Sequence, residues 1–467
     1  MFKKNIRPRQ VKKKVEKRKP AEYWSEYQNN IFEHVGKGEN HSVVLAAPGS
    51  GKTTTIIESL YHIPQNQSSL YLAFNSSVEE EFMLRCPLGT KAKTFHKLGM
   101  DTVRREWGAA YELRGRECID KDDQALELLV AKLIGNNKEG ERLRESIVWA
   151  TKMSKTMLAQ TVEEIERVCC EFGISSCGLQ NAEFSGIVEK ILNLSKQEPL
   201  MLNGKRVVSF DDMIWLPYVR GWQPEKFDRI FVDEAQDLSA ARINLALGAM
   251  FGHTKICSSG DLYQCIYQFA GANSDIINKL INDMEADTLP LSVSYRCPKK
   301  IVELAKDINP DIEASEFALD GDIHSCDIKD IANRVKPGSV ILSRNNYMVI
   351  NTAFALIKKG IKISIIGKDV GARFIWRIKN WKPASIADLK KSINNWRTEM
   401  IEIFGGRSAA RVNDEADSIM MFANASNTVD EAIKKIYDFF REDENSVILS
   451  TAHKAKGLEW DDVFILS

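Results

Sequence analysis

This 467-residue chain lacks the sequence features of collagen-like, mucin-like, membrane-spanning and repeat proteins. Glycine and proline number only 27 and 13, which excludes a collagen-like or mucin-like composition. No uncharged apolar run approaches the roughly 18 residues that a membrane-spanning helix needs. There is no internal repeat, and no low-complexity segment after residue 20. With 44% hydrophobic and 27% charged residues, the composition predicts a soluble globular protein of about three domains.

The chain has nine cysteines, yet none forms a CxxC pair or a Cys/His cluster at zinc spacing. This pattern predicts free thiols in a reducing compartment and no structural metal. Basic and acidic residues balance at 64 each, but residues 1–20 hold ten Lys or Arg against one Glu. That segment carries +9 and the remainder −9. We expect a solvated, disordered tail there, with a weak electrostatic attraction to nucleic acid.

Short apolar runs predict an α/β protein, because they are typical of buried parallel strands. A polar turn and a helical pattern follow two of these runs. Between 99 and 206 the pattern changes to amphipathic helices, which predicts a helical insertion within an α/β domain. The expected strands are residues 42–47, 229–232, 339–343, 362–366 and 447–451.

A phosphate-binding loop is predicted directly after the first of these strands. Residues 46–53 have the sequence AAPGSGKT, so glycines stand where backbone N–H groups must turn inward around phosphate oxygens. The following helix adds the positive end of its dipole. In this pattern Lys52 reaches the β- and γ-phosphates and Thr53 ligates Mg²⁺. The candidate ATP-binding residues here are Ala47, Pro48, Gly49, Ser50, Gly51, Lys52, Thr53 and Thr54.

Two adjacent carboxylates, Asp233 and Glu234, end another apolar strand. Alone, such a pair is usually a solvated turn. With a phosphate-binding loop upstream on a parallel sheet, Asp233 can instead hold the metal through water, and Glu234 can polarise the attacking water. The sequence therefore predicts hydrolysis of ATP or GTP, with Thr53 and Asp233 as the metal-binding residues.

With the DEAQD sequence at 233–237 a resemblance becomes specific: the motifs resemble those of superfamily 1 DNA helicases of the UvrD/Rep/PcrA type, and they follow the family's order from about residue 23 to the C-terminus. The resemblance implies that Gln28 binds the adenine, because an amide can donate to and accept from the base edge at once. It also implies that Tyr295 stacks on the base.

Later motifs imply residues that act on the phosphates and the ribose. Gln264 would sense the γ-phosphate, and Arg296 would act as an arginine finger. Residues 451–460 resemble the fifth motif, in which Gly457 and Glu459 would bind the nucleotide. The implied catalytic residues are Lys52, Asp233, Glu234, Gln264 and Arg296.

The resemblance also implies contacts to single-stranded DNA. Aromatic side chains would stack on any base and polar groups would hold phosphates, which suits a motor that must step along every sequence. Taken singly, such aromatic residues are more often core residues, and His96 could equally be a buried histidine. The implied DNA-contacting residues are Phe74, Asn75, Thr94, His96, Phe269, Arg344, Asn346, Thr451 and His453.

The implied fold consists of two RecA-like P-loop NTPase domains with parallel sheets, each with a helical insertion. A phosphate-binding loop on one domain and Arg296 on the other would meet only when the domains close on ATP, which couples hydrolysis to motion. The expected segments are a tail at 1–20, a first domain at 21–98 and 207–290 with an insertion at 99–206, and a second domain at 291–375 and 447–467 with a small helical insertion at 376–446.

The expected function is that of an ATP-dependent DNA helicase and single-stranded DNA translocase. Its polarity would be 3′-to-5′, because 456–460 resembles that branch of the superfamily. ATP and Mg²⁺ would be its cofactors. Its partners would be single-stranded DNA, duplex junctions and replication or repair proteins. We expect a cytoplasmic, nucleoid-associated protein, or a nuclear one in a eukaryote, without a membrane.

One departure from the family leaves alternatives open. The sixth motif, which supplies a second arginine, would follow the fifth, but the sequence stops at 467 before it. A truncated chain, a split gene with a separate C-terminal fragment or a degenerate protein would each explain this. The alternative to a motor is an ATP-switched DNA-binding scaffold. An RNA-directed motor is a third hypothesis, whereas an unrelated P-loop kinase does not explain the downstream motifs.

Overall fold

The computed structural model describes residues 23–110, 119–122, 124–135, 140–266, 271, 275–441 and 445–466, with the backbone alone at 110 and 403–408. The expected tail at 1–20 and the candidate Phe269 lie outside these ranges. Residue contacts divide the chain into two units. Unit 1 comprises residues 1–133, 151–165 and 187–323, and unit 2 comprises residues 134–150, 166–186 and 324–467.

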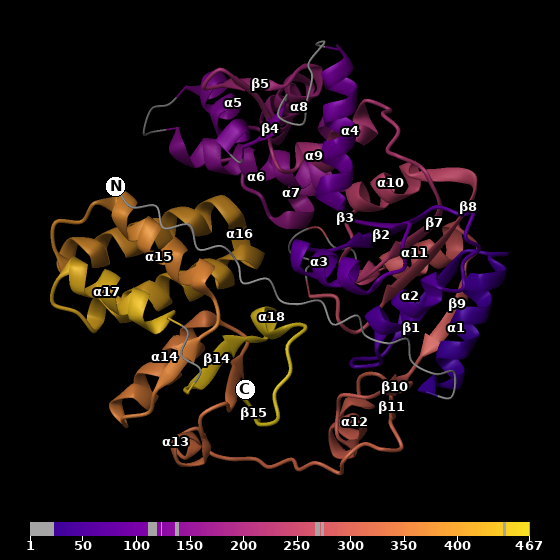
Figure 1. Cartoon of the computed structure of the whole chain (residues 1–467). Coiled ribbons are helices and arrows are strands. Elements are labelled where there is room, and N and C mark those ends of the chain that lie inside the picture. Colours follow the sequence, from indigo (N-terminus) through magenta and orange to yellow (C-terminus); the bar gives the residue numbers. More distant parts are fainter. Residues whose placement is uncertain are drawn as a thin grey trace, which may run out of the picture. The chain divides into compact units, whose positions relative to one another are not determined.

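Unit 1 is built on a six-stranded parallel sheet with the order β3-β2-β7-β8-β1-β9 (Figure 1). Its inner strands β1, β2 and β7 are almost wholly buried. Strands buried on both faces have continuous apolar sequences rather than alternating ones, which is why β1 and β7 could be predicted from the sequence, whereas β2 was not predicted. The strands are β1 (Ser42–Ala46), β2 (Ser69–Ala73), β3 (Thr90–Thr94), β7 (Phe227–Val232), β8 (Met250–Gly260) and β9 (Asp287–Leu291).

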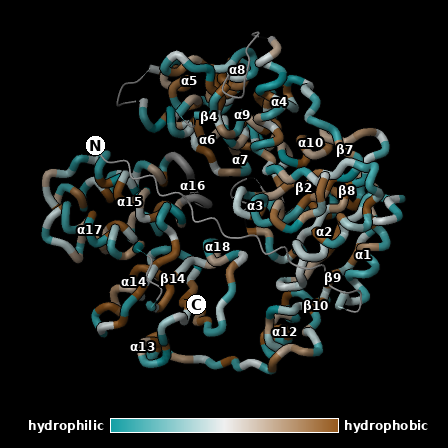
Figure 2. Tube along the Cα trace, in the orientation of Figure 1, coloured by the Kyte–Doolittle hydropathy of each residue, from teal (hydrophilic) through white to brown (hydrophobic). Residues whose placement is uncertain are grey.

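Helices cover both faces of this sheet. On one face α1, α2 and α3 contribute Ile31, Ile56 and Phe82 to the core. On the other, α4 and α10 contribute Phe95 and Leu245. Figure 2 shows hydrophobic residues along β2, whose side chains contribute to the cores on both faces. The elements are α1 (Glu26–Lys37), α2 (Lys52–Leu60), α3 (Ser76–Arg85), α4 (Phe95–Ala110), the 3-10 helix η2 (Ala235–Asp237), α10 (Ala240–Gly248) and α11 (Ile276–Asp283).

Between β3 and β7 the chain forms mainly helices, together with a small sheet of order β4-β6-β5. Thr161 begins α7 with a capping box: Glu164 N–H donates to Thr161 Oγ1 at 3.3 Å, and Thr161 N–H donates to Glu164 Oε2 at 3.1 Å. The elements are β4 (Asp120–Lys121), α5 (Gln124–Ile134), α6 (Glu141–Met157), α7 (Val162–Phe172), α8 (Asn181–Gln197), β5 (Leu200–Leu202), β6 (Lys205–Val208) and α9 (Asp212–Val219).

Residues 292–323 group with unit 1, whereas we expected the second α/β domain to begin at 291. The physical reason is a backbone contact: Tyr295 N–H donates to the Gly49 carbonyl at 3.0 Å and holds this segment against the phosphate-binding loop. Its elements are β10 (Val293–Ser294), α12 (Lys299–Ala305) and β11 (Glu313–Ala314).

Unit 2 contains a four-stranded parallel sheet of order β13-β14-β12-β15, so the class predicted from the sequence, two RecA-like α/β domains with parallel sheets, is confirmed. Its core joins Ile341 and Leu449 of the sheet to Phe374, Phe422 and Ile436 of the helices. No helix in the described ranges is both long and apolar enough to cross a membrane. The elements are α13 (Ile331–Arg334), β12 (Val340–Ser343), α14 (Asn346–Lys358), β13 (Ile363–Ile365), α15 (Lys368–Trp381), α16 (Ile386–Asn424), α17 (Val429–Phe439), β14 (Val447–Thr451), α18 (Ala452–Ala455) and β15 (Val463–Ile465).

Candidate nucleotide and nucleic-acid sites

The predicted phosphate-binding loop, residues 47–51, connects β1 to α2. Gly49 and Gly51 have φ angles of +73° and +81°, in the left-handed region that favours glycine. A Cβ at Gly49 would lie only 2.5 Å from the Cβ of Arg296, so close approach also requires glycine there. Lys52 begins α2, where the unpaired N–H groups and the dipole of the helix favour an anion.

One buried atom tests whether this loop fits a phosphate group. Ser50 is 1% exposed, and its Oγ has no hydrogen-bond partner among the described residues. A buried hydroxyl in that state needs an acceptor. Thr54 Oγ1 accepts instead from Arg85 Nη2 of α3 at 3.3 Å. Together with Lys52, Thr53 and the loop N–H groups, Ser50 suits a phosphate with its Mg²⁺ ion, so the residues present fit the predicted cofactors.

Lys52 and Glu234 form an ion pair, with Lys52 Nζ 2.9 Å from Glu234 Oε1. Burial alone would lower the pKa of Lys52, but the carboxylates of Glu234 and Asp233 raise it above its ordinary value overall. Lys52 is therefore protonated at neutral pH. Glu234 itself has a φ of +52°, a left-handed conformation that is costly for a residue with a side chain and is found mainly at functional sites.

The carboxylate of Asp233 is buried and held by three donors. Tyr71 Oη donates to Oδ2 at 2.8 Å, while Ser259 Oγ and the Glu234 N–H each donate to Oδ1 at 2.9 Å. Burial and the Asp233 carboxylate raise the pKa of Tyr71 far above its ordinary value, so its phenol stays a donor. This contact was not predicted from the sequence.

Gln236 is a second residue to which the sequence pattern assigned no role. It is 1% exposed and links two motifs, since its Nε2 donates to Glu234 and its Oε1 accepts from the Asp261 N–H at 3.0 Å. A Cβ at Gly260 would lie 2.7 Å from Gln236 Oε1, which explains the glycine. Gln264 follows in the same turn, and its N–H donates to the Asp261 carbonyl at 3.2 Å.

Gln28, the predicted adenine-binding residue, is buried and already hydrogen-bonded at both ends of its amide. Its Nε2 donates to Thr55 Oγ1 at 2.9 Å, and its Oε1 accepts from the Ser25 N–H at 3.1 Å within a capping box. The Ser25 hydroxyl also donates to Oε1, at 3.3 Å. The amide nitrogen has a second N–H, so Gln28 can keep these bonds and still donate to a base.

Tyr295 and Arg296 lie beside the phosphate-binding loop within unit 1. The Tyr295 backbone bonds to Gly49, and the Tyr295 side chain is 51% exposed. The structure thus brings both residues to the predicted phosphate-binding loop and groups them with that loop, not with the second α/β domain. Their roles as base-stacking residue and arginine finger stay predictions.

The described candidate DNA contacts of unit 1 lie at or just after the carboxyl ends of β2 and β3, and two of them accept hydrogen bonds from the first turn of a helix. Asn75 Oδ1 accepts from the Val78 N–H at 2.9 Å and caps α3. Thr94 Oγ1 accepts from the Lys97 N–H at 3.2 Å at the start of α4. These side chains satisfy backbone N–H groups in the first turns of α3 and α4, which have no partner within the helix.

Aromatic and cationic side chains gather next to these caps. The Arg242 guanidinium lies 4.8 Å from the centre of the Phe74 ring. His96 stacks on Phe210 with centroids 3.6 Å apart, and Lys121 Nζ lies 5.4 Å from the Phe210 ring. Burial lowers the pKa of His96 to about 3, so its ring is neutral at physiological pH. The sequence singled out Phe74 and His96. It did not single out Arg242, Phe210 and Lys121, because no local pattern marks these residues.

Unit 2 brings two predicted DNA contacts together. Ser343 and Thr451 are partners across the neighbouring parallel strands β12 and β14, so the residues after them share one edge of the sheet. Arg344 Nη1 lies 2.9 Å from His453 Nδ1. Arg344 is exposed, whereas Thr451 is buried.

Asn346 is occupied differently from the other candidates. Its side-chain Nδ2 donates to Asp414 Oδ2 of α16 at 2.8 Å, and its backbone N–H donates to the same oxygen at 3.0 Å. Through these bonds Asn346 connects the start of α14 to Asp414 of α16. Gly457 and Glu459 lie after α18, where Gly457 has a φ of +85°. Their nucleotide contacts stay predictions.

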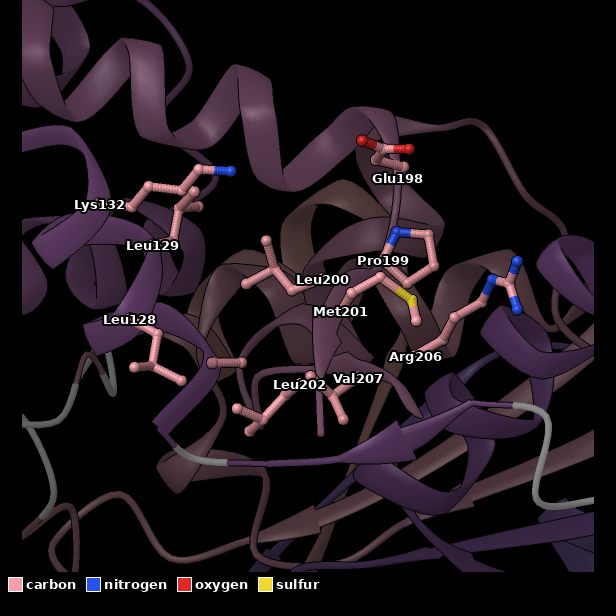
Figure 3. A pocket seen from close by; sticks show the side chains of 11 residues that line it. Leu128, Leu129, Lys132, Glu198, Pro199, Leu200, Met201, Leu202, Arg206 and Val207 are labelled. Carbon is pink, nitrogen blue, oxygen red and sulfur yellow. The ribbon is translucent and has the colours of Figure 1, made fainter. Parts of the chain in front are cut away.

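A cavity of about 310 Å³ in unit 1 shares no lining residue with these sites (Figure 3). It lies between α5 and the β5–β6 hairpin. Apolar side chains such as Leu129, Leu200 and Met201 line it, together with Lys132 and Arg206.

Comparison with known proteins identifies the family. The family model for the UvrD/REP helicase N-terminal domain matches residues 24–285. F-box DNA helicase 1 of Gallus gallus is 26% identical, over 94% of this chain and 44% of that protein. F-box DNA helicase protein 1 of Schizosaccharomyces pombe is 24% identical, over 90% of this chain and 50% of that protein. The ATP-dependent DNA helicase Rep of Escherichia coli is 25% identical, over 56% of this chain and 40% of that protein.

The chain spans about half the length of the curated relatives it matches. The match at 24–285 covers β1, β7 and β8 with the loops that carry the predicted phosphate, metal and γ-phosphate residues. Because this match covers more than half of the sequence, the chain belongs to the UvrD/REP helicase family.

Proposed function

We propose that this chain is an ATP-driven motor that translocates along single-stranded DNA with 3′-to-5′ polarity and acts as a DNA helicase. One observation carries the proposal: the candidate phosphate, metal and γ-phosphate residues follow β1, β7 and β8, and the first group of candidate DNA contacts lies at the ends of β2 and β3, in a single sheet. The carboxyl ends of parallel strands share one edge, where ligands of such sheets bind. The relatives are also named as DNA helicases.

The Lys52–Glu234 pair supports a specific order of events in hydrolysis. The γ-phosphate of ATP is an anion that competes with Glu234 for Lys52. When Lys52 binds the phosphate, Glu234 can turn to the attacking water, orient it and accept its proton. Mg²⁺, when bound, would neutralise phosphate charge, and Thr53 and Asp233 are the residues that would hold it.

Other residues would act on the nucleotide from positions near the loop. Gln264 would sense the γ-phosphate and Arg296 would stabilise the charge of the transition state. Gln28 and Tyr295 would bind the base, and the resemblance assigns ribose binding to Gly457 and Glu459.

The DNA strand would bind by stacking and by phosphate contacts, without sequence readout. Stacking on Phe74, or on the His96–Phe210 pair, would contribute about 1–3 kcal/mol per base. Arg344 and His453 would hold phosphates in unit 2. We propose single strands and duplex junctions as substrates, in whichever compartment contains the DNA.

Displacement of streptavidin from biotinylated oligonucleotides tests this function. A 3′-to-5′ motor with ATP should clear streptavidin from the 5′ end and leave it on the 3′ end. A parallel series with RNA oligonucleotides separates an RNA-directed motor. If ATP changes DNA affinity while neither end is cleared and no sustained phosphate release occurs, the chain is an ATP-switched scaffold and the motor proposal is wrong.

A further inference from the structure

The hydroxyl group of Tyr71 needs an explanation that packing does not provide. Tyr71 lies in the middle of β2 and is fully buried. Its ring stacks on Phe82 of α3, with centroids 3.6 Å apart and planes within 4° of parallel. A phenylalanine would make the same contact. The ring therefore contributes to packing of the core, and the hydroxyl group has a different role.

A buried phenolic O–H must find an acceptor, and that acceptor is the predicted metal ligand. Tyr71 Oη donates to Asp233 Oδ2 at 2.8 Å. Ser259 Oγ and the Glu234 N–H bond to the other oxygen, Oδ1. Among the described residues, Tyr71 alone bonds to Oδ2. Without it, the carboxylate would be held on one side only.

Strand register builds this contact. Tyr71 and Phe231 are partners across β2 and β7, and Asp233 lies two residues beyond Phe231. Because side chains alternate along a strand, all three lie on the same face of the sheet. The length of a tyrosine is what reaches from Tyr71 to the carboxylate, and a shorter polar residue at this position would not.

We propose that Tyr71 is a positioning residue of the metal site, whose hydroxyl holds Asp233 in the orientation that binds Mg²⁺ through water. The inference rests on the proposed ATPase function and adds a residue outside the predicted motifs. Removal of an outer hydrogen bond to a metal-binding group typically lowers metal affinity by about 10- to 100-fold. Since Asp233 would act through water, we expect the lower end of that range.

The test is a Mg²⁺ titration of fluorescent ADP binding to wild type and to Tyr71→Phe. The variant should need about tenfold more Mg²⁺ for half-maximal binding. Its ADP affinity in EDTA should match that of wild type within about twofold, because Tyr71 acts only through the metal ligand. Tyr61→Phe is the matched control, since it removes the exposed hydroxyl that donates to the Arg85 carbonyl. Thermal unfolding checks that Tyr71→Phe, which keeps its stacked ring, is folded.

A double-mutant cycle with Asp233→Asn separates positioning from a general structural effect. If Tyr71 acts through Asp233, adding Tyr71→Phe to Asp233→Asn should not change the Mg²⁺ requirement further. Unchanged Mg²⁺ dependence in Tyr71→Phe, or an additive effect in the double variant, overturns the inference alone. Should Tyr71→Phe fold poorly, Ser259→Ala must shift the Mg²⁺ requirement in the same direction. Wild type that binds no nucleotide with Mg²⁺ overturns the proposed function and this inference with it.

Discussion

Lys52 Nζ lies 2.9 Å from Glu234 Oε1, so the residue predicted to hold the phosphate is paired with the residue predicted to activate water. Lys52 begins α2, after the loop that follows β1, and Glu234 follows β7. The Glu234 carboxylate and the Lys52 ammonium group thus each have a partner of opposite charge until a phosphate competes for Lys52. The pair explains how two partly buried charges coexist here, and a phosphate that binds Lys52 would compete with it.

Substitution of each member of the pair should give a different result. Glu234→Gln removes the group that accepts the proton of water but keeps Lys52, so it should reduce ATP turnover by at least about a hundredfold and leave nucleotide binding intact. Lys52→Ala should weaken both binding and turnover. Phosphate release and fluorescent nucleotide binding measure the two effects. Lys37→Ala, which breaks an exposed pair with Glu33, should change neither.

Phe74→Ala should weaken binding of single-stranded DNA by roughly 5- to 150-fold, the loss of about one stacked base. The reason is that Phe74 follows β2 under the Arg242 guanidinium, where an aromatic face and a cation are presented together. Fluorescence anisotropy of a labelled oligothymidine measures this affinity. The matched control is Phe251→Ala. Phe251 is an exposed aromatic residue near the amino-terminal end of β8, whereas the candidate sites lie at the carboxyl ends of the strands. Equal losses in both variants would contradict the assignment of Phe74.

Substitutions of Arg344 and Asn346 should have different effects, because we expect Arg344 to contact DNA and Asn346 to stabilise unit 2. Arg344→Ala should lower DNA affinity and reduce the salt dependence of binding by about one phosphate contact. Asn346→Ala should instead lower the unfolding temperature, because Asp414 loses its Nδ2 donor. Salt titrations of DNA binding and thermal melts distinguish the two. A reduced salt slope for Asn346→Ala with an unchanged melt would refute this division.

Asp228 should stabilise unit 1 in a pH-dependent way. Hydrogen bonds from Ser68 and His253 lower the pKa of Asp228 to about 2. A lowered carboxyl pKa gives stability that is complete above the unfolded value near 3.9 and is lost as the pH falls through about 2. Asp228→Asn should therefore cost about 1 kcal/mol at pH 7, after allowance for solvent screening, and progressively less below pH 4.

Urea unfolding of wild type and Asp228→Asn at pH 7 and pH 3 measures this dependence. The difference between the two proteins should shrink at the lower pH. Asp320→Asn serves as the control, because Asp320 is 82% exposed. A difference that stays constant or grows toward pH 3 would show that the Asp228 contacts are not the source.

Local patterns predicted the elements that depend on neighbouring residues. The loop at 47–51 and its helix depend on glycines and on a lysine within a few positions, so their sequence is diagnostic. The capping box at Thr161 and the buried strands belong to the same class. Each is decided by residues close together in the chain.

Contacts between distant segments were not predicted, because no short pattern encodes them. Tyr71 looks like an ordinary core residue until β2 pairs with β7 and places it beside Asp233. Phe210 likewise becomes recognisable as a neighbour of a candidate DNA contact only in the folded structure, where it stacks on His96. Arg296 was expected in the second domain, which we predicted to begin at 291, yet the bond from Tyr295 to Gly49 places it with unit 1.

Steady-state phosphate release with and without single-stranded DNA tests the central proposal most directly. If one sheet edge binds both ATP and a DNA strand, wild type should hydrolyse ATP several-fold faster, roughly tenfold or more, when an oligonucleotide saturates the protein. Lys52→Ala should show no such stimulation. Wild-type turnover that stays the same with saturating DNA would contradict the proposal that this chain is a DNA-driven motor.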